Sequence, residues 1–372
     1  LVGSEMCIRD RSTWLDKVIF LGTGTSSQVP AIHCVTGSRS HCITCTDAMK
    51  PGSKNRRFCT SLVAIGSEPG RPDTSSTILI DCGKSFYESA LRYFPSNGLS
   101  KIDAVLLTHP HADAVLGLDD LRSWTMNGCI QDYVDIYLTQ ECMQTVGQMF
   151  PYLVDTSRAT GGGDVGALRW HLIDASTPFQ AGPHQVHVQP LYVEHGFVQN
   201  GRMPFGCLGF RIDSMSYISD CHYIPSETLD KVVGSDVFIL DGLKMKRHKS
   251  HFSIPQAITC VLDISFRHVQ QNLPPPTLAL ITDITHGIEH HDFSAQLQRH
   301  MKGLAAWLYE QNMDVKSASS EWWKTIWDEL ENEEHERLQL SVSCTTDKSH
   351  PLVPSMHLAY DGAQVCMSKN RL

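Results

Sequence analysis

The chain has 372 residues, of which 41% are hydrophobic and 19% charged, and its formal net charge is −9. This composition is typical of a globular protein with a substantial core, arranged as one large domain or two modest ones. The acidic balance argues against a general nucleic-acid binder, which needs clustered lysine and arginine, although it allows a small phosphorylated substrate. Because no run of 18 apolar residues occurs, we expect no membrane span.

The thirteen cysteines and the N-terminal residues bear on compartment and domain organisation. An odd number of cysteines without a secretory signal favours a reducing compartment, so we expect a cytoplasmic protein. Residues 1–12 have neither the apolar stretch of a signal peptide nor a periodicity that joins them to the next strand. We therefore expect a non-native or disordered leader over 1–12 and a single domain over 13–372, with a loosely ordered insertion near 341–350.

In chain order, apolar runs predict strands over residues 18–21, 76–81 and 102–107. The first run ends in a glycine-rich turn, and residues 31–60 are polar and rich in cysteine. Helical spacing of apolar residues predicts helices over 84–94 and 114–124.

The second half of the chain continues this mixture. Further strands are predicted over residues 134–138, 186–193, 207–212, 215–218, 237–240 and 277–281. Helices are predicted over 140–149, 253–263, 293–308 and the acidic segment 321–337. Many strands with interspersed helices and no regular βαβ period favour a mixed α/β sandwich over a doubly wound parallel sheet.

A metal-ligand pattern follows the strand predicted over 102–107. His109, His111 and Asp113 stand two residues apart just beyond its end, where alternate side chains can converge on one ion. Imidazole and carboxylate ligands with a coordination position left for water are the basis of metal-dependent hydrolysis. The alternative interpretation is that these are histidines of a surface loop.

Other residues of the same chemical types also stand where predicted strands stop. His195 follows one strand, Asp220 ends another, and His251 comes shortly after a third. This repetition favours an active centre over a chance cluster of polar residues.

In this order, several segments resemble the metallo-β-lactamase superfamily: Leu21-Gly22-Thr23-Gly24, Ile80-Asp81-Cys82-Gly83, His109-x-His111-x-Asp113, His195 and Asp220. Within it, Gly24 to Pro30, the cysteine cluster and Thr285-His286 are similar to the PhnP-like phosphodiesterases, which are relatives of ribonuclease Z. The resemblance implies an αββα sandwich of the metallo-β-lactamase fold. It also implies hydrolysis of a small cyclic or nucleotide-like phosphodiester by a metal-bound hydroxide.

The resemblance further implies roles for individual residues. His109, His111 and His195 would hold a first Mn²⁺ or Zn²⁺ ion, Asp220 would bridge two ions, and Asp113 would bind the second and take part in catalysis. His251 would contact phosphate or protonate the leaving oxygen.

Two positions depart from the family pattern. Ala114 stands where the family has a histidine, and Asp283 stands where it has its last active-site histidine. One interpretation is that the second ion has the carboxylates of Asp113, Asp220 and Asp283 as ligands, which favours Mn²⁺ or Mg²⁺. The alternatives are that the second site is vacant, which would make this a one-metal enzyme, or that Asp283 points elsewhere.

Three cysteines predict a separate structural Zn²⁺ site. Cys42 and Cys45 have the CxxC spacing of a zinc knuckle, and Cys34 lies eight residues earlier. The resemblance implies His286 as the fourth ligand, with four rivals among the histidines: His33, His41, His290 and His291. Alternatively, the three cysteines are reduced thiols in a loop.

Two weaker patterns have less specific interpretations. Gly22-x-Gly24 lacks the third glycine of a dinucleotide-binding loop, so a tight turn near the metals is the better interpretation. Arg56 and Arg57 either reach a substrate phosphate or are solvated.

The leading hypothesis is a metal-dependent phosphodiesterase with a small phosphodiester substrate. The alternatives are a tRNA-processing nuclease, a thioester or lactam hydrolase on the same fold, and a non-catalytic metal-binding protein. A homodimer is compatible with each of them, whereas a nucleic-acid or membrane partner is not expected.

Overall fold

The computed structural model describes residues 6–9, 14–37, 41–159, 165–198, 201–310, 350 and 352–368. The helix expected over 321–337 and all but the last residue of the insertion expected at 341–350 lie outside these ranges. Within the expected leader, Met6–Arg9 form strand β1, which pairs in parallel with β15.

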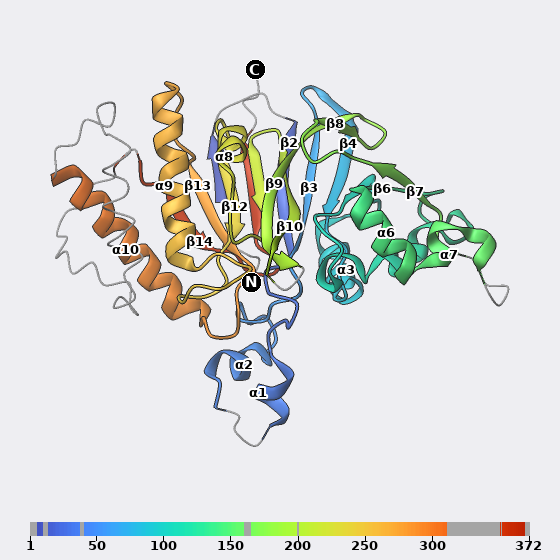
Figure 1. Ribbon diagram of the computed structural model, residues 1–372, viewed down its shortest axis with the longest axis horizontal. Helices are drawn as coiled ribbons and strands as arrows, with labels where there is room; N and C mark the ends of the chain where they lie inside the picture. The colour runs from blue at the N-terminus through green and yellow to red at the C-terminus, as the bar shows by residue number, and fades with distance from the viewer. Residues whose placement is uncertain are drawn as a thin grey trace.

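Two mixed β-sheets face each other (Figure 1). The first has the order β1-β15-β2-β3-β4-β5-β6-β7, and the second β14-β13-β12-β11-β10-β9-β8. The strands of the first sheet beyond β1 are β2 (Leu15–Gly22), β3 (Ser61–Glu68), β4 (Arg71–Ile80), β5 (Ala104–Leu106), β6 (Val134–Leu138), β7 (Leu168–Leu172) and β15 (Gln364–Ser368). Those of the second are β8 (Phe179–Ala181), β9 (Val186–Val198), β10 (Met203–Ile212), β11 (Met215–Ile218), β12 (Val237–Asp241), β13 (Leu278–Thr282) and β14 (Ser355–Leu358).

Helices cover the outer face of each sheet. Beside the first are α3 (Phe86–Tyr93), α4 (Ala112–Val115), α5 (Arg122–Thr125), α6 (Gln140–Met149) and α7 (Pro151–Val154), and beside the second are α8 (Ser226–Val232), α9 (Ile254–Gln270) and α10 (His290–Glu310). Two short helices, α1 (Ile32–Thr36) and α2 (Ile43–Ala48), lie outside the sandwich (Figure 1). This arrangement confirms the αββα sandwich. No helix in the described part of the chain is long and apolar enough to cross a membrane.

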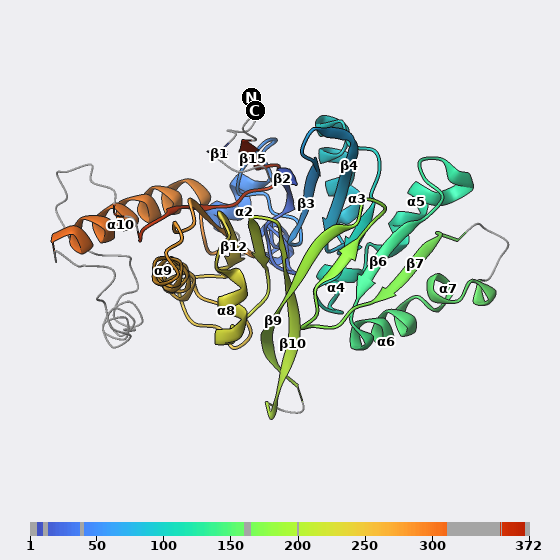
Figure 2. The same ribbon diagram turned by 90° about the horizontal axis from the view of Figure 1, so that it is seen from above.

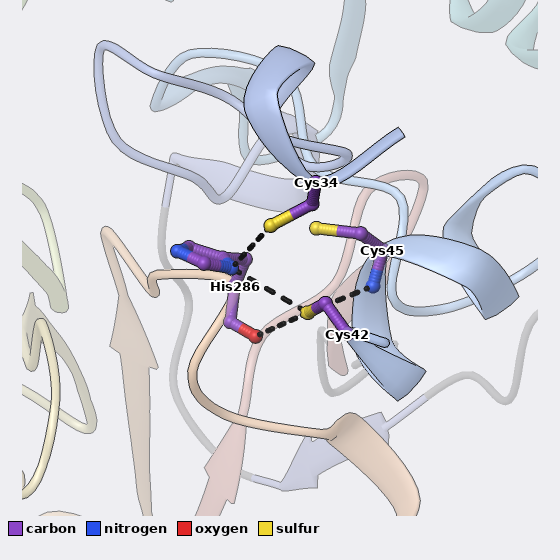
Figure 3. Close-up of side chains that lie close together, drawn as sticks. All are labelled: Cys34, Cys42, Cys45 and His286. Carbon is purple, nitrogen blue, oxygen red and sulfur yellow. Dashed lines mark hydrogen bonds between the residues drawn. The ribbon is translucent and has the colours of Figure 1, made fainter. Parts of the chain in front are cut away.

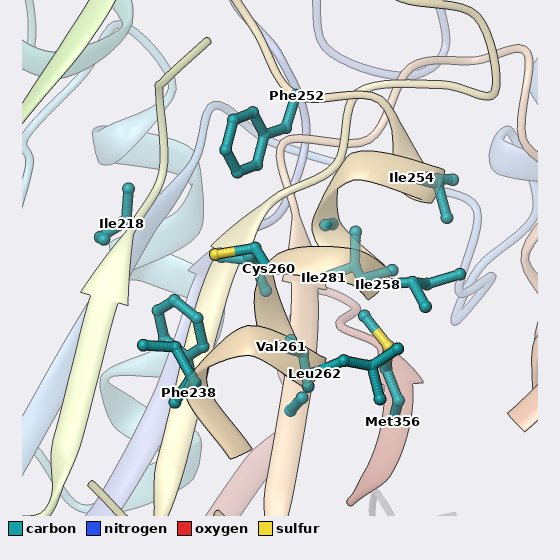
Figure 4. Packing of buried hydrophobic residues seen from close by; sticks show 14 of the residues in the cluster. Ile218, Phe238, Phe252, Ile254, Ile258, Cys260, Val261, Leu262, Ile281 and Met356 are labelled. Carbon is teal, nitrogen blue, oxygen red and sulfur yellow. The ribbon is translucent and has the colours of Figure 1, made fainter. Parts of the chain in front are cut away.

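Three apolar layers hold the sandwich together. One lies between the sheets and includes Phe20 and Phe210, and a second packs the first sheet against its helices. The third packs the second sheet against α9 and α10, with Phe238 and Ile258 among its buried residues (Figure 4). Full burial of one such side chain contributes roughly 1.5–3 kcal/mol, so the sheets form a rigid support for the loops at their edges.

The start of helix α9 is determined by its local sequence. Its N-cap, Ser253, accepts a hydrogen bond from the backbone N–H of Gln256, and the Gln256 side chain accepts one from the Ser253 N–H. This capping box, with Pro255 in the first turn, satisfies N–H groups that a helix end leaves open. The helix predicted over 253–263 is therefore confirmed, and it continues to Gln270.

The single helix predicted over 114–124 is wrong. The chain instead forms α4, a 3-10 turn over Leu118–Leu121, and α5. The backbone N–H of Gly117 donates to the Cys82 carbonyl at 2.8 Å, and a Cβ at Gly117 would lie 2.5 Å from the Gly83 carbonyl oxygen. This close approach to the turn after β4 ends the helix, and periodicity alone does not reveal it.

Strands β9 and β10 are long and extend beyond the two layers (Figure 2). They pair antiparallel, with Cys207 opposite Val193 and a bulge between Pro204 and Gly206. His195 lies on β9 near this bulge, so the pair carries a candidate ligand to the edge of the sandwich.

Candidate metal centre

Three carboxylates lie at one edge of the second sheet. Strands β11, β12 and β13 are parallel neighbours, so their carboxyl ends meet at the same edge. Asp220 lies just after β11, Asp241 is the last residue of β12, and Asp283 follows β13. All three are at most 1% exposed. Topology therefore gathers buried negative charge at this edge.

Three imidazoles converge beside these carboxylates. His109 and His111 follow β5, His195 comes from β9, and one ring nitrogen from each lies within 4.8 Å of the others. Their ring centroids are 4.6–5.2 Å apart, and the Phe205 ring stacks on His111 at 5.0 Å. Asp220 is close as well, since it forms a second such group with His195 and His251.

In two of the three rings, those of His109 and His195, hydrogen bonds fix which nitrogen is free. The Thr108 hydroxyl donates to the buried Asp81 carboxylate at 2.9 Å and therefore accepts from His109 Nδ1 at 2.8 Å. His195 Nδ1 donates to the Ser250 carbonyl at 2.8 Å. Both rings thus keep Nε2 free, and His109 Nε2 is buried without a hydrogen-bond partner. This is the arrangement of imidazoles that ligate a metal.

Electrostatics keep these rings in the form that binds a metal. Burial lowers the pKa of His109 to about 3, with the charge of Asp220 opposing the shift. Burial likewise lowers the pKa values of His111 and His195. Neutral imidazole is the ligand form, so the three rings are ready to coordinate at neutral pH.

His251 lies between two of the strand-end carboxylates. Its Nδ1 is 2.9 Å from Asp241 Oδ2, 2.8 Å from Asp283 Oδ2 and 4.0 Å from Asp220 Oδ1. Burial lowers the pKa of His251, but the charges of Asp241 and Asp283 outweigh it and raise the pKa to about 12. The ring is therefore cationic and held in place.

Several carboxylate oxygens in this centre have no hydrogen-bond partner. Asp220 Oδ2, Asp241 Oδ1, Asp113 Oδ1 and Asp283 Oδ1 are buried without one. An unsatisfied buried polar atom costs about 1–3 kcal/mol, and more for a charged group. Burial also raises the pKa values of Asp241 and Asp283. A bound cation would stabilise their charged forms and contact the open oxygens, so the residues fit one.

The proposed second-ion ligands are arranged differently from the sequence expectation. Asp113 Oδ1 lies 3.8 Å from His109 Nε2, and burial together with Asp220 raises the Asp113 pKa to about 6. Asp283 instead groups with Asp241 and His251, and no group in the described part of the chain unites Asp113, Asp220 and Asp283. The second ion therefore stays a prediction.

Sequence reasoning missed two features of this centre. Asp241 ends a strand as the other candidates do, and that position is the signal that could have identified it. Asp81 and Asp283 both have left-handed backbone conformations, with φ of 60° and 59°, which no local pattern indicates. Such strain in a non-glycine residue is concentrated at functional sites.

A second cluster lies outside the sandwich, on α1, α2 and the segment after β13 (Figure 3). One ligand atom from each of Cys34, Cys42, Cys45 and His286 lies within 4.8 Å of the others. His286 Nδ1 is 3.5 Å from Cys34 Sγ and 3.5 Å from Cys42 Sγ. Three thiols and one imidazole are a ligand set of structural zinc.

The rival histidines are outside this group. The ring of His33 lies edge-on to His286, with centroids 5.3 Å apart, and none of His33, His41, His290 and His291 belongs to the four-residue group. The geometry therefore favours His286 as fourth ligand, and zinc binding itself stays a prediction.

Arg57 connects the segment that follows β2 and precedes β3 to the segment that carries His286. Its side chain is fully buried, and its guanidinium donates to the carbonyls of Thr285 at 2.8 Å and Ile288 at 2.9 Å. It is thus neither solvated nor directed at a substrate. Arg56 forms an ion pair with Glu88 at 2.9 Å.

Comparison with known proteins places this geometry in a family. Residues 76–270, more than half of the chain, match the model of the beta-lactamase superfamily domain. An octanoyltransferase of Porphyromonas gingivalis is 31% identical over 246 residues, which is 66% of this chain, and the chain spans 43% of the length of that relative.

Solved structures share the fold along nearly the whole chain. A diphosphatase of the PhnP family is 20% identical, with a TM-score of 0.61, and the match covers 95% of this chain and 98% of that one. Zinc-bound PqqB of Methylobacterium extorquens is 14% identical, with a TM-score of 0.56 and coverage of 94% and 99%. With two sheets between helical layers and ligand-type residues at the strand ends, the chain belongs to the metallo-β-lactamase superfamily.

Proposed function

We propose that this member of a superfamily of metallo-hydrolases is a phosphodiesterase that cleaves a small phosphodiester. The observation that carries the proposal is the convergence of His109, His111 and His195 beside Asp220, with buried nitrogen and oxygen atoms that lack partners. Such atoms are costly unless a cation binds them, and the ligand types suit Mn²⁺ or Zn²⁺.

Each residue has a separate task in this proposal. A bound ion would lower the pKa of a water molecule and polarise a phosphoryl oxygen. The imidazoles of His109 and His195 are oriented to hold it by Thr108 and Ser250. His251 is held by carboxylates at Nδ1, so its Nε2 can supply a proton to the leaving oxygen.

Two considerations favour a phosphodiester over other substrates. The similar PhnP-family structure is described as a diphosphatase, and a phosphodiester bond resembles its substrate class in needing charge stabilisation at phosphorus. The net charge of −9 argues against a long RNA substrate, because RNA binding depends on many contacts between cationic side chains and phosphates.

A second candidate is an acyl or thioester hydrolase, and the relative named octanoyltransferase favours it. That relative is more than twice as long as the matched region, so its name covers sequence that this chain does not match. The fold itself allows either chemistry.

Hydrolysis assays separate these functions. Purified full chain with Mn²⁺, Zn²⁺ or Mg²⁺ is offered an aryl phosphodiester, an octanoyl thioester and a lactam side by side. We expect turnover of the phosphodiester and its loss in His109→Ala. Turnover of the thioester alone would select the second candidate, and no turnover with any ion would contradict both.

We also propose that the cluster of Cys34, Cys42, Cys45 and His286 binds one structural Zn²⁺. The support is the four-ligand geometry on two short helices, whose surroundings form a small apolar cluster with only two buried residues, Cys45 and Ala48, from the helices themselves. A cytoplasmic location and a homodimer stay predictions.

A further inference from the structure

The three imidazoles of the metal centre are held in different ways. His109 Nδ1 donates to the Thr108 hydroxyl and His195 Nδ1 to the Ser250 carbonyl, each at 2.8 Å. No hydrogen bond within the described part of the chain reaches the ring of His111. An imidazole that binds a metal usually has its second nitrogen fixed by a neighbouring group, so a different contact must orient this third ring.

The backbone of His111 is fixed, whereas its side chain is exposed. Its carbonyl accepts from the N–H groups of Ala114 at 3.0 Å and Val115 at 3.1 Å at the start of α4. The side chain is open to solvent, and the second side-chain torsion of histidine has broad, roughly two-fold preferences. A hydrogen bond to solvent does not select one orientation, so the ring would turn about this torsion unless another group packs on it.

Phe205 provides such a contact. Its ring packs nearly parallel to that of His111, with centroids 5.0 Å apart and 17° between the planes. It meets His109 and His195 at larger angles, 73° and 58°, with centroids 6.4 Å and 6.2 Å away. Aromatic rings attract each other at separations of about 4.5–7 Å. The imidazole without a hydrogen bond is therefore the one that has the parallel stack.

A β-bulge brings Phe205 to this place. At the bulge between β9 and β10, Phe205 lies opposite two residues of β9, His195 and Gly196. Gly196 has a left-handed conformation with φ of 74°, and a Cβ there would lie 2.9 Å from Ser250 Cβ, so the bulge needs a glycine. Bulges re-aim side chains and are frequent next to active sites. This one directs Phe205 and His195 to the same group of imidazoles.

The stacked orientation of His111 is also the one that suits a metal. In it, one ring nitrogen of His111 lies within 4.8 Å of a ring nitrogen of His109 and of His195. An imidazole that coordinates an ion shares its positive charge, and a cation is attracted to the face of an aromatic ring. An ion in this centre would thus strengthen the stack.

We infer that Phe205 is the positioning residue of the third ligand, because its stacked ring holds the His111 imidazole in the orientation that binds the ion. The inference rests on the ion of the proposed function, and it applies to either candidate substrate. It assigns the effect to the aromatic face, since an aliphatic side chain at position 205 would fill space without stacking.

Metal affinity tests the inference. Binding of Mn²⁺, which thiolates bind less well than zinc, is measured by competition with a chelator for the full chain and for two variants, Phe205→Leu and Phe205→Tyr. We expect about tenfold weaker binding in Phe205→Leu, at the low end of the roughly 10–100-fold contributed by groups that orient a ligand. Phe205→Tyr keeps the aromatic face and should bind as the wild type does. Wild-type affinity in Phe205→Leu, or an equal loss in Phe205→Tyr, would overturn the role of the stack.

Phe179→Leu is the matched control. Phe179 is half-buried like Phe205, and it stacks on Tyr137 with centroids 5.2 Å apart and 19° between the planes. Tyr137 is not a candidate ligand, so the substitution removes a comparable stack at a distance from the ion. We expect wild-type affinity for Mn²⁺. A tenfold loss in this control as well would overturn the inference, because it would show that any lost stack weakens the centre.

A spectroscopic measurement before Mn²⁺ is added keeps the inference separate from the proposed function. The ring current of Phe205 should shift the ring-proton signals of His111, which are identified in isotope-labelled protein by their absence in His111→Gln. We expect the shift to disappear in Phe205→Leu and to remain in Phe205→Tyr. Identical His111 signals in the wild type and Phe205→Leu would overturn the inference. The expected shifts in a protein that binds no divalent ion would refute the proposed function and leave the orientation of His111 by Phe205 standing.

Discussion

The two candidate metal clusters of this protein have different structural supports. The centre of His109, His111 and His195 lies at strand ends and is backed by two sheets with three apolar layers. The cluster of Cys34, Cys42, Cys45 and His286 lies on two short helices, whose own apolar cluster holds only Val29, Ala31, Cys45 and Ala48 as buried residues. The first centre is held in place by the fold, whereas the second would hold its surroundings in place through the proposed zinc ion.

This difference separates chemistry from stability. A centre that the fold positions in advance can use the bound ion for reaction, because its ligands need no reorganisation. A cluster without apolar support gains its order from the ion, since metal binding there is part of folding. Variants of the His109, His111 and His195 centre should therefore lower activity, whereas variants of the cysteine cluster should lower stability.

The largest expected effect on activity is that of His109→Ala, which removes a direct ligand. Loss of a partner that only orients a ligand costs about 10–100-fold, so loss of the ligand itself should exceed a hundredfold in kcat/KM. Elemental analysis should still find one zinc per chain, bound by the cysteine cluster. If the variant lost that zinc as well, the two clusters would not be independent.

A smaller loss is expected from Thr108→Val, which keeps the side-chain volume but removes the hydroxyl between Asp81 and His109. His109 then loses the acceptor at Nδ1 that fixes its ring, and we expect metal affinity and kcat/KM to fall about 10–100-fold. Affinity is measured by competition with a chelator. Thr145→Val, a partly exposed position on α6, is the control. Unchanged metal affinity in Thr108→Val would show that the hydrogen bond does not position the ligand.

Cys42→Ser should leave activity within tenfold of the wild type and reduce stability instead. Cys42 is the N-cap of α2, and serine is a good N-cap, so the substitution removes the zinc ligand while preserving the cap. We expect one zinc fewer per chain and a lower Tm in calorimetry, by roughly 2–4 °C for each kcal/mol lost. Cys129→Ser, an exposed cysteine elsewhere, should change neither. A wild-type zinc content in Cys42→Ser would refute the structural site.

The sequence predicted those features that depend on local pattern. Ligand-type residues that follow apolar strands identified the three histidines and Asp220, because a strand end and its next residues are contiguous in the chain. The CxxC spacing likewise identified two members of the cysteine cluster.

Features that depend on which strands become neighbours could not be predicted. Asp241 and Asp283 meet at His251 only because β12 and β13 pair in parallel. Arg57 is buried because its guanidinium bonds to carbonyls 228 and 231 residues away. Ala114 has no ligand group, and it packs into the apolar layer between the first sheet and its helices.

The smallest expected effect is that of His268→Gln, which should lower the stability of the sandwich and leave activity at neutral pH unchanged. His268 near the end of α9 is buried, donates from Nδ1 to the Ile264 carbonyl, and accepts at Nε2 from the Gly234 N–H at 2.7 Å. Burial lowers its pKa, so the folded ring is neutral and the unfolded chain binds the proton first. Its contribution to stability is therefore full above the unfolded pKa of about 6.5 and is lost as the pH falls below it.

Urea unfolding at pH 7.5 and 5.5 measures this contribution. We expect His268→Gln to be less stable than the wild type by about 1 kcal/mol at pH 7.5, because a buried hydrogen bond is lost, and to lose less stability on acidification. His187→Gln, an exposed histidine, should match the wild type at both pH values. The same pH dependence in His268→Gln and the wild type would show that acid acts elsewhere. The zinc content of the same samples is measured in parallel. If His268→Gln lowers the free energy of unfolding without a change in zinc content, the stability of the sandwich does not depend on an ion at the cysteine cluster.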